Sequence, residues 1–454
     1  MTAPVEERSE RPKPPAMSSP RATLGRMPRI PISGPATPRA FPLLWGGTAS
    51  ANLADGITLA VAPLLAAAIT RDPALVAGLV VAQRLPWLLF VLFSGVIVDR
   101  FDRRMLLIAG NLLRFAALGG VTLSLAFGVR EIWILYAAAF LIGMAETVVD
   151  NASLAVLPQL VCREKLSDAN GRIFATQSVL NEFVGPPLGA LVFSLSAVAA
   201  FATGSAVYLL AVVVFGLLPR RLRDEEPSAV ATQSVWRSVG EGLREFVRTP
   251  ILIVMAGSAA AINFFSSGAD AVFVLFSQDR LGLTDAGYGI LLAAAAVGGI
   301  PAGLLGPAII RRLGEGTVWV GSTAAAGLAF GAAAWTTSPV IVAIVMAISN
   351  FGFTLGNIVA ITVRQTAIPN AMLGRVTSVY RLLAVGVMPL GALAGGLFAS
   401  AFGLTTPFWI AAGGMLLLAI VTAPYMRTGR IRALIAEDRD ATPDGPPIAE
   451  ARSE

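Results

Sequence analysis

The chain has 454 residues, of which 55% are hydrophobic and only 14% are charged, and its mean hydropathy is +0.72. This composition excludes an ordinary soluble domain and is typical of a chain that dissolves in lipid. Basic side chains outnumber acidic ones by 34 to 28, histidine is absent, and Cys162 is the single cysteine. These counts exclude histidine metal sites, histidine proton relays and an intrachain disulfide.

The first 42 residues are rich in proline, arginine and serine and contain no apolar core. This composition fits neither a signal peptide nor a membrane span. We therefore expect residues 1–42 to form a disordered cytoplasmic tail.

Twelve apolar windows follow, each bounded by charges, Pro-Gly turns or short polar loops. A helix needs roughly 20 apolar residues to cross the ~30 Å hydrocarbon core of a bilayer. The predicted spans are residues 43–69, 74–98, 105–127, 132–156, 173–195, 199–218, 251–276, 286–310, 317–335, 339–363, 375–402 and 407–425.

The longest internal polar segment divides these spans into six and six. We expect an N-terminal bundle over 43–218, a cytoplasmic linker over 219–250, a C-terminal bundle over 251–425 and a cytoplasmic tail over 426–454. Within the linker, SVWRSVGEGLREFVRT has the pattern of an amphipathic helix on a membrane surface.

The arginines predict the orientation of the spans. If the N-terminus is cytoplasmic, the opposite side keeps only Arg71, Arg130 and Arg280 in its loops, and the other loops and tails hold the rest. Because cytoplasmic loops are enriched in positive charge, we expect both termini in the cytoplasm.

Two echoes in the sequence indicate a duplicated six-helix unit. Gly95 stands eight residues before Arg103, and Gly303 stands eight residues before Arg311; the pentapeptide PLGAL occurs at both 187–191 and 389–393. Pseudo-symmetric halves of this kind are typical of secondary transporters that bind substrate near the midplane. Neither lysine of the chain, Lys13 or Lys165, follows a glycine as a phosphate-binding loop requires. Without that loop or another enzyme motif, we expect a transporter and not an enzyme.

The segment GVIVDRFDRR, residues 95–104, resembles the G-x-x-x-D-R-x-x-R-R signature of the major facilitator superfamily. Two other segments, LPQLVCREKLSDANGR at 157–172 and VRQTAIPNAMLGRVTSVYR at 363–381, resemble its exporter branch, the transmembrane secretion effector type that includes enterobactin and macrolide efflux proteins. The resemblance spans residues 40–426. It implies an all-α membrane protein with the major facilitator fold, 12 transmembrane helices in two pseudo-symmetric six-helix bundles.

In the fifth span, GPPLG resembles the core of a signature associated with drug antiporters, through Gly185, Pro186 and Gly189. Asn181 stands where an upstream glycine is often found, which weakens the antiporter meaning. A packing role is the alternative, because small residues let membrane helices approach closely.

The resemblance also implies a cytoplasmic gate. In that family the acid at Asp99 meets the N-terminal end of the eleventh helix, here near Arg375, where the helix dipole favours a carboxylate. The positions carried over to this gate are Gly95, Asp99, Arg100, Arg103, Arg104 and Arg375.

Ionisable side chains inside the bilayer cost some ~2.5 to 3.5 kcal/mol each on insertion scales, so each suggests a function. Six lie deep in the first half: Asp55, Arg84, Arg114, Glu146, Asp150 and Glu182. The proton affinity of a carboxyl depends on its burial and on neighbouring charge. We therefore expect Asp55, with one of the three other acids, to carry a proton, and the two arginines to tune that affinity. The alternatives are a permanent salt bridge from Asp55 to Arg84, and structural pairs of Glu146 and Asp150 with loop arginines.

The second half is more neutral at depth. Its candidates for lining a cavity are Asn263, Asn350 and Asn357, while Asp270 is expected nearer the outside. This asymmetry suggests ion coupling in the first half and an apolar, amide-bearing wall in the second.

The sequence thus predicts a monomeric, multi-pass protein of the bacterial inner membrane. Its expected activity is export of a small, partly apolar molecule, a drug, siderophore or other secondary metabolite, by proton antiport. Its expected partners are that small molecule, protons and the bilayer, with no nucleic acid, cofactor or metal. The alternatives are an importer or facilitator on the same fold, and a membrane scaffold that does not transport.

Overall fold

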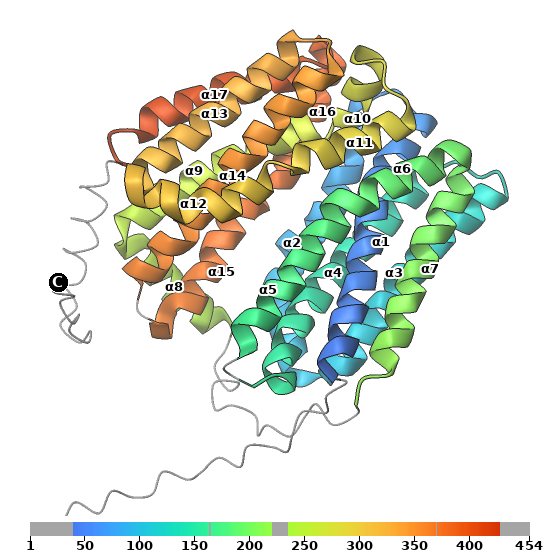
Figure 1. Ribbon diagram of the computed structural model, residues 1–454, viewed down its shortest axis with the longest axis horizontal. Helices are drawn as coiled ribbons and strands as arrows, with labels where there is room; N and C mark the ends of the chain where they lie inside the picture. Colours follow the sequence, from blue (N-terminus) through green and yellow to red (C-terminus); the bar gives the residue numbers. More distant parts are fainter. Residues whose placement is uncertain (1–39, 163–164, 220–234, 369, 427–454) are drawn as a thin grey trace, which may run out of the picture. The chain divides into compact units, whose positions relative to one another are not determined.

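The computed structural model describes residues 40–162, 165–219, 235–368 and 370–426, and within them the regular structure is helical (Figure 1). The predicted tails 1–42 and 426–454 fall almost entirely outside these residues. Eleven described helical segments are long and apolar enough to cross a membrane, and a shorter apolar helix, Thr406–Thr422, follows them.

The first six spans form one group of packed helices, blue to green in Figure 1. The fifth span combines three helical segments, of which the middle one, η2, is a π-helix. In chain order the segments are α1 (Ala40–Ile69), α2 (Pro73–Arg100), α3 (Arg103–Ala126), α4 (Ile132–Leu160), α5 (Leu166–Gln177), η2 (Ser178–Val184), α6 (Gly185–Leu195) and α7 (Ala197–Gly216).

The linker contains one described helix, α8 (Val235–Arg248), which packs on α15. The seventh, eighth and eleventh spans of the second half are each divided into more than one segment. These segments are α9 (Pro250–Asp270), α10 (Phe273–Leu275), η4 (Phe276–Arg280), α11 (Asp285–Ala296), α12 (Gly299–Leu313), α13 (Glu315–Trp335), α14 (Pro339–Ala367), α15 (Asn370–Gly386), α16 (Met388–Phe402) and α17 (Thr406–Thr422).

Polar caps and glycines separate consecutive spans. The Asp102 carboxylate accepts a hydrogen bond from the Met105 backbone N–H at 3.1 Å, and the Ser196 hydroxyl accepts one from Ala199 at 3.3 Å. Such side chains satisfy the free N–H groups of a helix start. Gly314 and Gly403 end their helices with φ of 82° and 98°, a conformation that favours glycine.

The two PLGAL copies lie at matching close helix contacts. A Cβ added to Gly189, the glycine of the first copy, would come within 2.8 Å of the Ile57 carbonyl oxygen, and one added to Gly185 just before it within 2.6 Å of the backbone of Gly56, so α6 and α1 touch through glycine. In the second half, a Cβ on Gly391 or Gly395 would collide with the backbone of α9. Small residues therefore set the distance between helices at both places, as the packing alternative for GPPLG expects.

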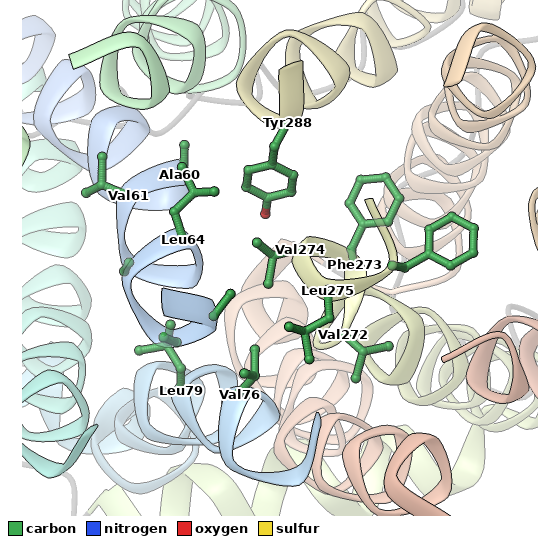
Figure 2. Close-up of a cluster of buried hydrophobic side chains, with 14 of the residues drawn as sticks. Ala60, Val61, Leu64, Val76, Leu79, Val272, Phe273, Val274, Leu275 and Tyr288 are labelled. Atoms are coloured by element: carbon green, nitrogen blue, oxygen red, sulfur yellow. The ribbon is translucent and has the colours of Figure 1, made fainter. Parts of the chain in front are cut away.

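The apolar cores differ between the two ends of the molecule. We call the end with the α1–α2 loop the distal end, and the end with Ala40 and Met426 the proximal end. At the distal end one continuous core, here the distal core, contains side chains of both halves. Figure 2 shows part of it: Ala60, Val61, Leu64, Val76 and Leu79 come from α1 and α2, and Val272, Phe273, Val274, Leu275 and Tyr288 come from the second half.

The proximal end has two separate cores instead. One contains described residues of the first half only, from Ala40 to Leu218, and the other contains residues of the second half only, from Phe246 to Met426. Among the described side chains, the two halves therefore share a core at the distal end and have separate cores at the proximal end.

Candidate functional site

A central cavity of about 440 Å³ lies between the two halves. Phe273 and Tyr288 of the distal core form part of its wall, and most of its lining is aliphatic or aromatic. Its charged lining residues are Arg84 on α2, Glu182 on η2 and Asp270 on α9, which we call the cavity site.

Asp270 is the last residue of α9, where the seventh span is interrupted before α10. The residues just before it, Ser267, Gly268 and Ala269, are buried, whereas Asp270 is exposed and lines the cavity. An electrostatic interaction links its carboxylate with Arg84 of the other half. The cavity site is therefore built from both halves.

A second group of charges lies inside the first half. The Arg114 guanidinium is 1% exposed, and its Nη1 lies 3.5 Å from the Asp55 Oδ2. The Tyr208 hydroxyl donates a hydrogen bond of 2.6 Å to Asp55 Oδ1, and the Arg114 guanidinium lies 5.7 Å from the centre of the Tyr208 ring. Asp55 thus joins α3 and α7 through one carboxylate.

Glu146 and Asp150 complete this group from α4. Both carboxylates interact electrostatically with Arg114, and Glu146 also does so with Arg84. Two Arg114 nitrogens, Nε and Nη2, are buried and form no hydrogen bond among the described residues. We call this group the Arg114 site; it contains Asp55, Arg114, Glu146, Asp150 and Tyr208. Three carboxylates therefore surround one guanidinium, two of whose nitrogens donate no hydrogen bond among the described residues.

The six predicted intramembrane charges thus divide between two sites. Among the described residues, Asp55 forms its ion pair with Arg114 and not with Arg84. Arg84 and Glu182 instead line the cavity. Glu182 is exposed on the π-helix η2, a kind of segment that often occurs at functional positions.

The three predicted amides have different places. Asn350 lines the cavity. Asn263 donates a hydrogen bond of 2.8 Å to the Ala384 carbonyl and so joins α9 to α15. Asn357 is exposed and does not line the cavity.

The predicted gate residues are only partly described. The surroundings of Gly95 and the side chain of Asp99 lie outside what the structure describes, and Arg100 is exposed. Arg103 donates to the Ala155 carbonyl at 2.9 Å, and Arg104 donates to the Gly216 carbonyl. Arg375 forms an ion pair with Glu241 of α8, which links the linker helix to the start of the eleventh span.

Polar contacts join the two halves at the distal end. The Asp72 carboxylate accepts hydrogen bonds from the Ser400 hydroxyl at 2.7 Å and from the Ala74 N–H at 2.9 Å. These bonds, that of Ser400 first, lower the pKa of Asp72 below its ordinary value of 3.8. Nearby, Arg71 donates to Gln278 at 2.7 Å and lies 3.4 Å from Asp279.

Two site residues escaped the sequence-based prediction, Asp270 and Tyr208. The sequence predicts Asp270 nearer the outer end of the seventh span, and Asp270 does lie nearer to Arg280 than to Pro250 along the chain. The sequence-based prediction did not include Asp270 among the residues that line the cavity. The available signal was an ionisable side chain within an apolar span; for Tyr208 there was none, because an aromatic residue in a span usually packs.

Comparisons with known proteins agree with this architecture. The model of the transmembrane secretion effector family matches residues 32–450. The multidrug efflux pump Tap of Mycolicibacterium fortuitum is 28% identical over 383 residues, 82% of this chain and 92% of Tap. The enterobactin exporter EntS of Escherichia coli is 24% identical over 344 residues, 73% of this chain and 79% of EntS.

Solved structures of transporters have the same fold. A bacterial homologue of the iron transporter ferroportin, in an inward-facing state, has a TM-score of 0.69 at 19% identity and covers 86% of this chain and 98% of its own. A bacterial homologue of the lysosomal transporter Spinster, also inward-facing, has a TM-score of 0.66 at 15% identity and covers 88% of this chain and 98% of its own. The predicted all-α fold with two six-helix halves is thereby confirmed.

Proposed function

The chain belongs to the transmembrane secretion effector family of major facilitator transporters, and from that premise we propose that it exports a small, partly apolar molecule in exchange for protons. The relatives named as a multidrug efflux pump and an enterobactin exporter support the direction of transport. The mostly apolar lining of the cavity supports the kind of substrate.

We further propose that the structure is an inward-facing state with both termini in the cytoplasm. The shared distal core and the Asp72–Ser400 and Arg71–Gln278 bonds then close the outer side. The separate proximal cores leave each half free to move at the inner side. Substrate enters the cavity from the cytoplasm, and the halves rock to close behind it.

The observation that carries proton coupling is the Arg114 site. Among the described residues Arg114 forms its close ion pair with Asp55, whereas Arg84 and Arg381 reach Glu146 and Asp150 only through longer-range electrostatic interactions. At least one acid is therefore stabilised by a proton whenever the site is shielded from water. We assign the exchanged proton to Asp55, with Glu146 and Asp150 as the acids that take over Arg114 when Asp55 is protonated. The two Arg114 nitrogens without partners are the donors for this exchange.

The gate of the inner side is also part of the proposal. When the cytoplasmic side closes, the acid at Asp99 meets the N-terminal end of α15, whose dipole favours a carboxylate. The pair of Arg375 with Glu241 is then the inner-open arrangement of that helix end.

The test uses everted membrane vesicles energised with acid inside, in which export appears as uptake of ethidium and as release of protons reported by a pH dye. Wild-type protein is expected to release protons when ethidium is added. Asp55→Asn is expected to abolish that release and to retain ethidium exchange without a gradient. Asp168→Asn, on the exposed start of α5, is the matched control and is expected to behave as wild type.

The rival functions predict other results. A facilitator needs no exchanged proton, so its transport would be unchanged by Asp55→Asn. A scaffold would transport no probe at all. Proton release that persists in Asp55→Asn would show that the Arg114 site does not carry the coupling.

A further inference from the structure

We propose that the cavity site binds an amphipathic cation with a single positive charge, and that Asp270 is the counter-ion of that charge. The proposal names the substrate class for the proposed export, and so rests on it for transport. Binding can be measured without transport, which separates the two.

The first argument is the charge of the cavity wall. Among the described residues that line it are two carboxylates, Glu182 and Asp270, and one guanidinium, Arg84. The wall has one excess negative charge when both acids are ionised. In an apolar enclosure an unmatched charge is costly, so a ligand that supplies one positive charge is favoured.

The second argument is the position of Asp270 at the end of α9. A helix C-terminus carries a partial negative charge from the carbonyl groups of its last turn. At the end of α9 the Ser267 and Ala269 carbonyls accept backbone hydrogen bonds from Ala271 and Val272, and the remaining partial charge adds to the carboxylate. Interrupted membrane helices use such C-terminal ends to bind cations. Within the described part of the chain, no hydrogen bond or close ion pair holds the Asp270 carboxylate, which leaves it available to a ligand.

The third argument is the role of Arg84. It approaches Asp270 from α2 of the other half and interacts with it electrostatically without a close ion pair. It also interacts with Glu146 of the Arg114 site. A ligand cation at Asp270 repels the Arg84 guanidinium toward Glu146, and so connects cargo binding with the charges of the first half.

The apolar part of the ligand has its own surroundings. Phe201, Phe273 and Tyr288 present aromatic surface, and aliphatic side chains of both halves cover the rest. Aromatic faces attract cations at about 6 Å or less. The volume of about 440 Å³ falls within the ~300 to 1,000 Å³ range of pockets for drug-sized ligands.

The experiment compares two ions of the same shape and opposite charge, tetraphenylphosphonium and tetraphenylborate, by equilibrium binding to the purified full chain in detergent. Tetraphenylphosphonium is expected to bind more tightly. Asp270→Asn is expected to weaken it about tenfold or more, and Asp270→Glu to restore it to within about threefold. Arg84→Gln is expected to strengthen it, because the internal competitor is removed.

Glu131→Gln is the matched control, since Glu131 is an exposed acid in the loop before α4 and does not line the cavity. It is expected to bind tetraphenylphosphonium as wild type does. If Asp270→Asn cannot be recovered folded, the comparison of the two ions with wild type and Arg84→Gln still decides the charge preference.

Tighter binding of tetraphenylborate, lost in Arg84→Gln, would overturn the proposal in favour of an anion site. Equal binding of tetraphenylphosphonium by wild type and Asp270→Asn would overturn it as well. Asp270-dependent binding without proton-driven export would contradict the proposed function and leave this inference standing. Ethidium export that is unaffected by Asp270→Asn would contradict this inference and leave the proposed function standing.

Discussion

The Arg114 site and the cavity site contain similar residues in opposite surroundings. In the Arg114 site the guanidinium is fully buried and pairs with Asp55 inside a single half. In the cavity site, Asp270 is exposed to the cavity and faces an arginine that belongs to the other half. A carboxylate inside one rigid half can gain or lose a proton without a change in the shape of the cavity. An electrostatic interaction between the two halves, in contrast, must break and form again whenever the halves move.

Under the proposed function, this difference separates proton exchange from cargo binding. The Arg114 site is suited to proton exchange because it excludes large ligands. The cavity site is suited to cargo because both halves reach it. Substitutions in one site are therefore expected to alter its own task more than the other task, to which the interaction of Arg84 with Glu146 connects it.

The largest effect is expected from Arg114→Met. It leaves three carboxylates without their shared guanidinium, and the loss of one partner of a buried pair costs about 3 to 5 kcal/mol. Proton-driven ethidium transport should be lost and thermal unfolding in detergent should occur at lower temperature. Tetraphenylphosphonium binding should remain within about threefold of wild type. Loss of binding in folded Arg114→Met protein would mean that the two sites are not separable.

A smaller effect is expected from Tyr208→Phe. The change deletes the 2.6 Å hydrogen bond to Asp55 and keeps the ring beside Arg114. A hydrogen bond to a charged group contributes about 1.5 to 3 kcal/mol, so proton-driven accumulation should fall roughly tenfold. Exchange of ethidium without a gradient should be unchanged. Tyr380→Phe, in the second half and stacked on Arg364, is the matched control.

The smallest effect is expected at the distal end, which belongs to neither site. Because the pKa of Asp72 is lowered in the folded protein, its contribution to stability is present above its ordinary pKa of 3.8 and is lost as pH falls through the lowered value. Melting temperature between pH 5 and pH 3 should therefore decrease less in Asp72→Asn than in wild type. The difference should correspond to the ~1 kcal/mol or less of exposed polar pairs.

Ser400→Ala should reproduce part of this effect, because its hydroxyl is the first cause of the lowered pKa. Neither variant should change tetraphenylphosphonium binding. A change in binding would show that the distal bonds shape the cavity as well as joining the two halves.

The number of spans and the two halves could be predicted from the sequence, because the length of an apolar run and the repeated glycine motifs can be recognised along the chain itself. Which side chains contact each other between helices could not be predicted. Depth along a helix placed Asp55 and Arg84 at the same level, but the rotation of each helix decided that Asp55 meets Arg114 while Arg84 faces the cavity. The same reason explains Asn350, which lines the cavity, and Asn263, which binds the Ala384 carbonyl.

The distal core has a thermodynamic consequence. Opening the distal end must expose to water or cargo apolar side chains such as Leu64, Leu79 and Phe273, which both halves now bury together. Exposure of apolar surface raises heat capacity. The free-energy difference between the states with the distal end closed and open should therefore depend on temperature along a curve and not a straight line. An apolar cargo that covers this surface would reduce the curvature.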